Sequence, residues 1–288
     1  MTLPDLRGPL RVTIGLHRHV LWAALALVLL AAIALPAGRW YVQSLAEDLA
    51  ATGCKVENTV PGCGTQVRGF LSRSLYVNKM FGIVGLAMGA LPLLLGAFAA
   101  GPLIGREFES GTYRLQWTQS VSPARWLAAK LSVPVAGVLL VLPAFVLLAA
   151  WIRRGTLDTR YPIQWYDLPV YQVIGPVAVG YALLGITVGA LAGLLIGRTV
   201  PAMATAVTAV GIVGAALILL RPSLWPALDG PPRGGDHWDF SRQADRIGIR
   251  HHPESHFWPL QLVESAILLA LSAAAIVAAF ALLRRRHR

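Results

Sequence analysis

Long apolar stretches alternate with short polar segments along the whole chain. Six stretches of 18 to 27 residues contain no Asp, Lys or Arg, and only the last contains a Glu. They cover residues 20–37, 80–104, 131–152, 170–196, 200–220 and 260–283. Because a helix rises about 1.5 Å per residue and a hydrocarbon core is about 30 Å thick, each stretch is long enough to span a bilayer. The pattern predicts an all-α, polytopic membrane protein with six transmembrane helices in one domain.

The composition supports this interpretation. Hydrophobic residues make up 56% of the chain and charged residues 14%, whereas soluble domains carry about 25% charged residues. The net charge of +11 does not indicate nucleic-acid binding, because Lys and Arg flank the spans and form no stripe with interleaved aromatics. A soluble enzyme, a nucleic-acid-binding domain and a β-barrel are therefore excluded.

The distribution of basic residues predicts cytoplasmic N- and C-termini. The inner segments would be 1–19, 105–130, 197–199 and 284–288, and the exterior loops 38–79, 153–169 and 221–259. The inner segments carry 12 Lys or Arg in 53 residues, and the exterior loops 13 in 98. The basic tail 284–288 directly after the last span gives the sharpest signal, whereas Arg153 and Arg154 oppose it.

The first nineteen residues allow two interpretations. Residues 1–19 form either a basic amphipathic helix at the inner interface or a charged leader that orients the first span. The stretch 20–37 is long for the apolar part of a signal peptide, and five more spans follow it. We therefore interpret it as a retained span.

The predicted exterior loops hold the two cysteines and a histidine cluster. Cys54 and Cys63 lie in loop 38–79, where they form a disulfide in an oxidising exterior and stay free thiols otherwise. His251, His252 and His256 lie in loop 221–259. No pair of them stands at helical spacing beside a carboxylate that would orient it, so we predict a Pro-rich cap and no metal site.

The spans lack the side chains that ion-coupled transport or catalysis requires. Glu264 is their only ionisable residue, and we interpret it as a boundary residue that snorkels toward the membrane surface. Ion-coupled transporters place such groups at midmembrane depth. We therefore predict no catalytic residue and no enzyme. The three lysines lie outside any G-x-x-x-x-G-K-[ST] pattern, so the chain has no P-loop for ATP.

Four glycines recur at every fourth position of the fourth span. They are Gly185, Gly189, Gly193 and Gly197. Small residues at this spacing let two helix backbones approach closely, so the pattern favours tight helix packing, within the bundle or between two copies. A glycine-lined path for a substrate is the alternative.

The longest inner loop, 105–130, combines acidic residues with a predicted short helix. Glu107 and Glu109 precede Gly111, and 112–119 has the length of two helical turns. Ser122 is then an N-cap and Pro123 the first residue of the helix that enters the third span.

This loop resembles the membrane-spanning permease subunits of ATP-binding-cassette (ABC) exporters, and more narrowly the six-span permeases common in actinobacteria. The motif is E-x-x-x-G-T, followed by a Ser-rich turn, an Arg and a Lys. The matching residues are Glu107, Gly111, Thr112, Ser122, Arg125 and Lys130. Two features depart from this pattern. Many relatives have a proline at the position of Ser120, and the Pro123-Ala124 pair stands between Ser122 and Arg125.

The resemblance implies a permease of the bacterial plasma membrane that dimerises, with itself or a second permease, and docks onto separately encoded ATPase subunits. ATP and Mg would be bound by those partners, and this chain would bind no cofactor and no nucleic acid. The implied contact with the ATPase comprises Glu107, Glu109, Gly111, Thr112, Tyr113, Arg114, Leu115 and Trp117. The apolar spans suit export of a hydrophobic or amphipathic substrate. The alternatives are a non-transporting membrane sensor or assembly partner, and a polytopic membrane enzyme.

Overall fold

The computed structural model describes Ile33 and residues 36–41, 43–56, 62–118, 122–154, 164–230, 237–242 and 249–286. The expected interfacial segment 1–19 and nearly all of the expected first span lie outside these residues. Within the described part, five helices are long and apolar enough to cross a membrane, over Gly64–Ser110, Pro123–Arg154, Val177–Ile196, Thr199–Ser223 and Glu254–Arg285. They contain the second, third, fifth and sixth apolar stretches and most of the fourth, which confirms the all-α polytopic membrane fold. The count of six stays a prediction.

The second span is part of a much longer helix. α2 (Gly64–Leu94) continues through the π-helical η1 (Leu95–Ala100) into α3 (Gly101–Ser110). At about 1.5 Å per residue, these 47 residues extend about 70 Å, more than twice the thickness of a hydrocarbon core. The segment 38–79 is therefore not a loop in its second part, which is helical, whereas its exterior position stays a prediction.

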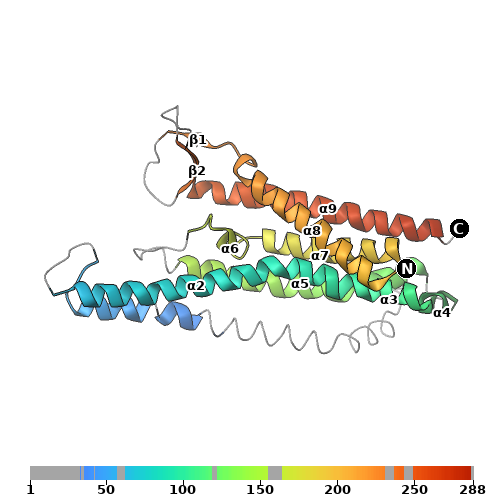
Figure 1. Cartoon of the computed structure of the whole chain (residues 1–288), viewed down its shortest axis with the longest axis horizontal. Helices are drawn as coiled ribbons and strands as arrows, with labels where there is room; N and C mark the ends of the chain where they lie inside the picture. Colours follow the sequence, from blue (N-terminus) through green and yellow to red (C-terminus); the bar gives the residue numbers. More distant parts are fainter. Residues whose placement is uncertain are drawn as a thin grey trace, which may run out of the picture.

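The first part of that segment is helical as well and packs against α2. Residues 36–41 and 43–51 are helical wherever they are described, and Figure 1 shows this blue helix beside the cyan start of α2. Leu45 and Leu49 bury against Phe70, and the Cys54–Cys63 disulfide closes the hairpin. Charged residues such as Glu47, Asp48 and Arg73 interrupt both helices, so a search for continuous apolar stretches does not detect the pair.

The remaining spans surround a central helix. α5 (Pro123–Arg154), α8 (Thr199–Leu220) and α9 (Phe257–Arg286) pack around α7 (Val177–Ile196), together with α2, η1 and α3. In its most apolar stretch α7 is 67% buried, whereas α8 is 17% buried. α8 therefore has the least protein cover of the five.

The fourth span begins later than predicted. Residues 164–176 form a folded segment with a short helix, α6 (Leu168–Tyr171), and α7 starts only at Val177. Gln261 of α9 holds this junction: its amide donates to the Tyr171 carbonyl at 2.8 Å and accepts from the Val177 N–H at 3.2 Å. The apolar stretch from 170 contained no charge to mark this break.

Glycines on both sides bring α7 against the long helix. A Cβ at Gly185 would overlap the Pro92 carbonyl, and one at Gly189 would lie 2.5 Å from the Gly96 carbonyl oxygen. At Gly193 it would lie 3.0 Å from the Gly101 oxygen. Three residues of the predicted stripe thus lie against another helix of the same chain. Gly197 has a different position, because it ends α7 with φ +65°.

The predicted Pro-rich cap contains a small sheet. β1 (Leu228–Asp229), β3 (Ile249–Pro253) and β2 (His237–Arg242) pair antiparallel in the order β1-β3-β2. Two short turns, η2 (Arg221–Ser223) and η3 (Glu254–His256), connect it to α8 and α9. Figure 1 shows it at the end of the bundle opposite α4. We refer to the two ends as the sheet end and the α4 end.

Candidate functional site

The inner loop 105–130, with its implied contact to the ATPase, is called the coupling segment here; it contains a short helix at one end of the bundle. α3 ends at Gly111 (φ +72°), α4 (Thr112–Thr118) follows, and α5 begins at Pro123, with the Arg125 N–H donating to Ser122 Oγ at 3.4 Å. The predicted short helix and helix start are thereby confirmed. The expected loop 105–130 is largely helical, because α3 continues to Ser110 before the left-handed glycine ends it.

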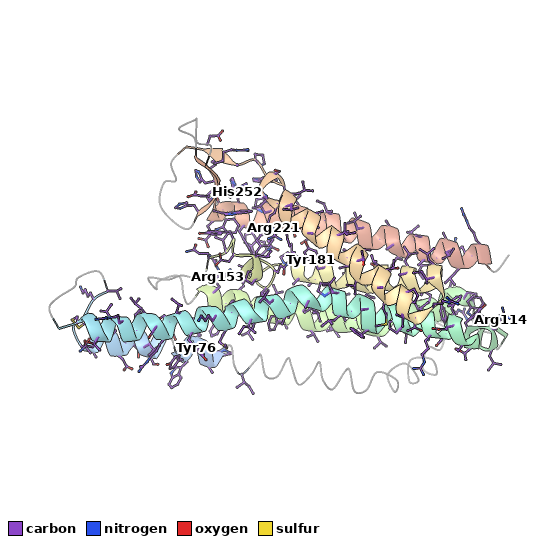
Figure 2. All side chains as sticks on the ribbon, viewed as in Figure 1. Tyr76, Arg114, Arg153, Tyr181, Arg221 and His252 are labelled. Carbon is purple, nitrogen blue, oxygen red and sulfur yellow. A yellow bond between two sulfur atoms is a disulfide. The ribbon has the colours of Figure 1, made fainter. Side chains whose placement is uncertain are left out.

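Aromatic rings fasten α4 to the bundle. Phe108 stacks on Tyr113 with ring centroids 4.3 Å apart, and Trp117 meets Phe108 and Trp126 edge-on at 6.2 and 6.1 Å. Tyr113 and Trp117 therefore contact α3 and α5. Thr112, Arg114 and Leu115 lie on the exposed side, and Leu115 is 67% exposed. Figure 2 shows Arg114 at the extreme end of the molecule.

Glu107 is engaged inside the chain. Its carboxylate accepts from Lys130 Nζ at 2.5 Å and from the Trp126 indole N–H at 3.0 Å, so it joins α3 to the start of α5. Glu107 and Lys130 are both residues of the ABC-permease motif, and the structure accounts for their joint presence as an ion pair.

Glu109 is engaged with a different helix. It accepts from the Thr199 N–H at 3.0 Å and from the Thr199 hydroxyl at 2.7 Å. Thr199 is the first residue of α8, so a carboxylate satisfies a free N–H at a helix N-terminus, where negative charge is favoured. Sequence reasoning missed this contact, because the two residues are 90 positions apart.

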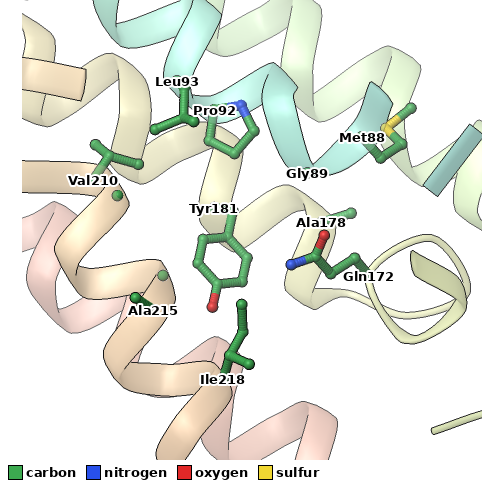
Figure 3. A pocket seen from close by; sticks show the side chains of 12 residues that line it. Met88, Gly89, Pro92, Leu93, Gln172, Ala178, Tyr181, Val210, Ala215 and Ile218 are labelled. Atoms are coloured by element: carbon green, nitrogen blue, oxygen red, sulfur yellow. The ribbon is translucent and has the colours of Figure 1, made fainter. Parts of the chain in front are cut away.

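A cavity of about 260 Å³ lies between α2, α7 and α8. Its lining comprises Met88, Gly89, Pro92, Leu93, Gln172, Ala178, Tyr181, Val210, Gly211, Gly214, Ala215 and Ile218. Figure 3 shows the Gln172 amide and the Tyr181 ring entering this space. The other lining groups are apolar, which suits an apolar ligand with a polar group.

The Tyr181 hydroxyl contacts a buried ion pair. Arg221 donates to both oxygens of Glu264, at 2.9 and 3.0 Å, and the Tyr181 hydroxyl donates to Glu264 at 2.9 Å. The Glu264 side chain is 0% exposed, so its interpretation as a snorkelling residue is wrong. The Arg221 guanidinium also lies 3.9 Å from the centroid of the Tyr171 ring. Because Arg221 lies beyond the apolar stretch 200–220, the sequence did not indicate this partner.

The histidines lie beside the sheet. His252 Nε2 donates to the Pro222 carbonyl at 3.1 Å, and its Nδ1 lies 2.9 Å from His256 Nδ1. Burial lowers the pKa of His252, and the nearby His256 lowers it further. In the described part of the chain, no three His, Cys, Asp or Glu residues are grouped to hold a metal ion.

Nearby, Arg153 is buried and pairs with Glu254 at 3.0 Å. The Glu254 carboxylate offsets the positive charge of Arg153, which had opposed the predicted topology.

These features define a class: a polytopic α-helical membrane protein with an apolar cavity between its spans and a short helix at one end of the bundle. The model of the family described as ABC-2 membrane transporter related matches residues 24–221, more than two thirds of the chain. The chain belongs to this family. The matched range includes α2 to α8, the cavity and the coupling segment. No curated protein and no solved structure matches the chain.

Family membership confirms the resemblance found in loop 105–130. The chain is a permease-type membrane subunit of an ABC transporter. Its coupling residues, the number of its spans and the narrower actinobacterial resemblance stay predictions.

Proposed function

We propose that this chain exports a hydrophobic or amphipathic substrate, driven by separate ATPase subunits that dock on α4. The observation that carries the docking proposal is the two-sided character of α4. Its aromatic side is fixed to α3 and α5, while Arg114 and Leu115 face away from the bundle. A partner that binds this outer side would push on a rigid element, because the aromatic contacts leave α4 little freedom to move alone.

The proposed docking surface differs from the one implied by the motif alone. Because Glu107 binds Lys130 and Trp126, and Glu109 binds Thr199, we assign these acids to positioning and not to contact with the ATPase. Thr112, Arg114 and Leu115 then form the contact, and Gly111, Tyr113 and Trp117 shape it.

The proposed orientation places the α4 end in the cytoplasm. α9 brings Arg284 and Arg285 to the same end as α4, where positive charge is expected on the cytoplasmic side. Exposed aromatics, Trp151 (48%) and Trp258 (55%), mark the helix ends on the opposite side, as at a membrane interface. The disulfide-closed hairpin then lies outside the cell, where disulfides persist.

The cavity supports an apolar substrate. It is lined by α8, the span with the least protein cover, so a second permease copy placed against α8 would enclose it. Tyr181 and Gln172 offer a polar group at one wall, which suits an amphipathic molecule.

The substrate proposal is tested by filling the cavity. Ala215→Trp places a large ring in the lining, whereas Ala216→Trp, one position further, adds the same ring outside it. The complex with its ATPase, in lipid nanodiscs, is assayed for ATP hydrolysis with a panel of fluorescent amphipathic dyes. We expect stimulation by at least one dye, lost in Ala215→Trp and retained in Ala216→Trp. Equal stimulation in both variants would contradict the assignment of the cavity.

A further inference from the structure

We propose that Glu109 is a positioning residue that makes α8 follow the movements of α4. The inference rests on the proposed function, because it requires an ATPase that acts on α4. It extends that function by identifying how a force on α4 reaches the wall of the cavity.

The first step is the connection between α4 and the end of α3. Only Gly111 separates the two helices, and the Ser110 hydroxyl lies 2.9 Å from that of Thr112 across this turn. Phe108 of α3 stacks on Tyr113 of α4. A displacement of α4 therefore displaces the last turn of α3, where Glu109 lies.

The second step is the connection from α3 to the start of α8. Glu109 binds both the N–H and the hydroxyl of Thr199. One turn earlier, a Cβ on Gly105 would lie 3.3 Å from the Arg198 oxygen, so the two backbones are in contact there. The packing at Gly105 can push α8 but cannot pull it. The hydrogen bonds of Glu109 supply the attachment that resists separation.

The third step is the anchor at the other end of α8. Arg221 follows the last residue of α8, and its two hydrogen bonds to Glu264 hold it to α9. The helix between Thr199 and Leu220 has one proline, Pro201 in its first turn, so α8 transmits displacement as a rod. A rod held at Arg221 and displaced at Thr199 tilts.

The tilt changes the cavity. α8 contributes Val210, Gly211, Gly214, Ala215 and Ile218 to the lining. Because the fixed point is near Arg221, Val210 would move further than Ile218, and the cavity would open or close most at its α4-end wall. Glu109 is thus the link between the proposed docking helix and the proposed substrate cavity.

The closing experiment is hydrogen exchange measured by mass spectrometry on the permease–ATPase complex in nanodiscs, before and after trapping with ATP and vanadate. In the wild-type complex we expect trapping to change exchange in α4 and in the first turns of α8, residues 199–205. In Glu109→Ala we expect the ATPase to copurify and α4 to respond, while the response of 199–205 falls at least threefold. Glu109→Gln keeps an acceptor oxygen and is expected to respond as the wild type.

A second variant approaches the link from α8. Thr199→Val removes the hydroxyl and keeps the N–H, so its α8 response is expected to be reduced, whereas Thr199→Ser is expected to restore it. The inference is overturned if Glu109→Ala retains the wild-type response at 199–205, or if trapping leaves 199–205 unchanged in the wild type. It is also overturned if Glu109→Ala loses the ATPase, because Glu109 is then a docking contact. Absence of any ATPase from the wild-type preparation contradicts the proposed function instead.

Discussion

The buried pair of Arg221 and Glu264 allows the most quantitative test of the structure. Glu264 is 0% exposed and accepts three hydrogen bonds, two from Arg221 and one from Tyr181. Glu264→Ala would leave a guanidinium that is 4% exposed without its counter-charge, and would leave the Tyr181 hydroxyl without this acceptor. Breaking a buried pair by removing one partner costs about 3–5 kcal/mol.

The expected loss is measurable by thermal unfolding of the detergent-solubilised chain. A cost of about 3–5 kcal/mol corresponds to a fall in Tm on the order of 10 °C, at about 2–4 °C per kcal/mol for a chain of this size class. Replacing both residues, Arg221→Met with Glu264→Met, removes both charges and is expected to recover most of the loss. The recovery distinguishes a buried pair from a general intolerance of substitution.

A matched control is available at the exposed pair of Asp229 and Arg250. These side chains are 81% and 52% exposed and 3.7 Å apart, so Asp229→Asn is expected to cost less than about 1 kcal/mol. Glu264→Gln makes the same chemical change in the buried pair and is expected to lower Tm several times more. A Tm of Glu264→Ala within about 2 °C of the wild type, or a double variant as unstable as the single one, would show that no buried ion pair stabilises the chain at this position.

Two further predictions concern packing and pH. Gly189→Ala is expected to destabilise the chain strongly, because its Cβ would lie 2.5 Å from the Gly96 carbonyl oxygen. A Cβ at Gly211 meets nothing within 4 Å, so Gly211→Ala is expected to be neutral or stabilising. Thermal unfolding of both variants measures the difference. Burial lowers the pKa of His252 in the folded state, whereas in the unfolded chain this histidine keeps its ordinary pKa of about 6.5. The unfolded chain therefore binds more protons, and stability falls as the pH falls through that value. His252→Gln is expected to flatten this slope in Tm measured from pH 8 to pH 5.5, and an unchanged slope would speak against His252 as its source.

The five described spans were predictable because each presents an uninterrupted apolar stretch, and such a stretch has few alternatives to a transmembrane helix. Helix ends were less predictable. α2 begins at Gly64, and the start of its hairpin depends on contacts between two helices, such as that of Leu45 with Phe70.

The coupling segment was predictable in position but not in orientation. Gly111 and Ser122 are local signals for a helix end and a helix start, and both occur as expected. Which face of α4 turns outward depends on ring contacts with Trp126, and the direction of Glu109 depends on Thr199, far along the chain. Long-range pairs of this kind leave no periodic trace in a single sequence. The same holds for Arg221 and Glu264.

Copurification shows whether a separate ATPase docks on the outer side of α4. The tagged chain is isolated from its native membrane in mild detergent, and copurifying proteins are identified and quantified by mass spectrometry. Leu115→Glu places a charge on the proposed docking surface, whereas Leu228→Glu makes the same change at an exposed position at the sheet end. We predict a stoichiometric subunit with a P-loop in the wild type and in Leu228→Glu, and its loss in Leu115→Glu. If no such subunit is recovered with the wild type, even with crosslinker and nucleotide, this chain does not work with a separate ATPase. Full recovery with Leu115→Glu would show that the ATPase does not dock on α4.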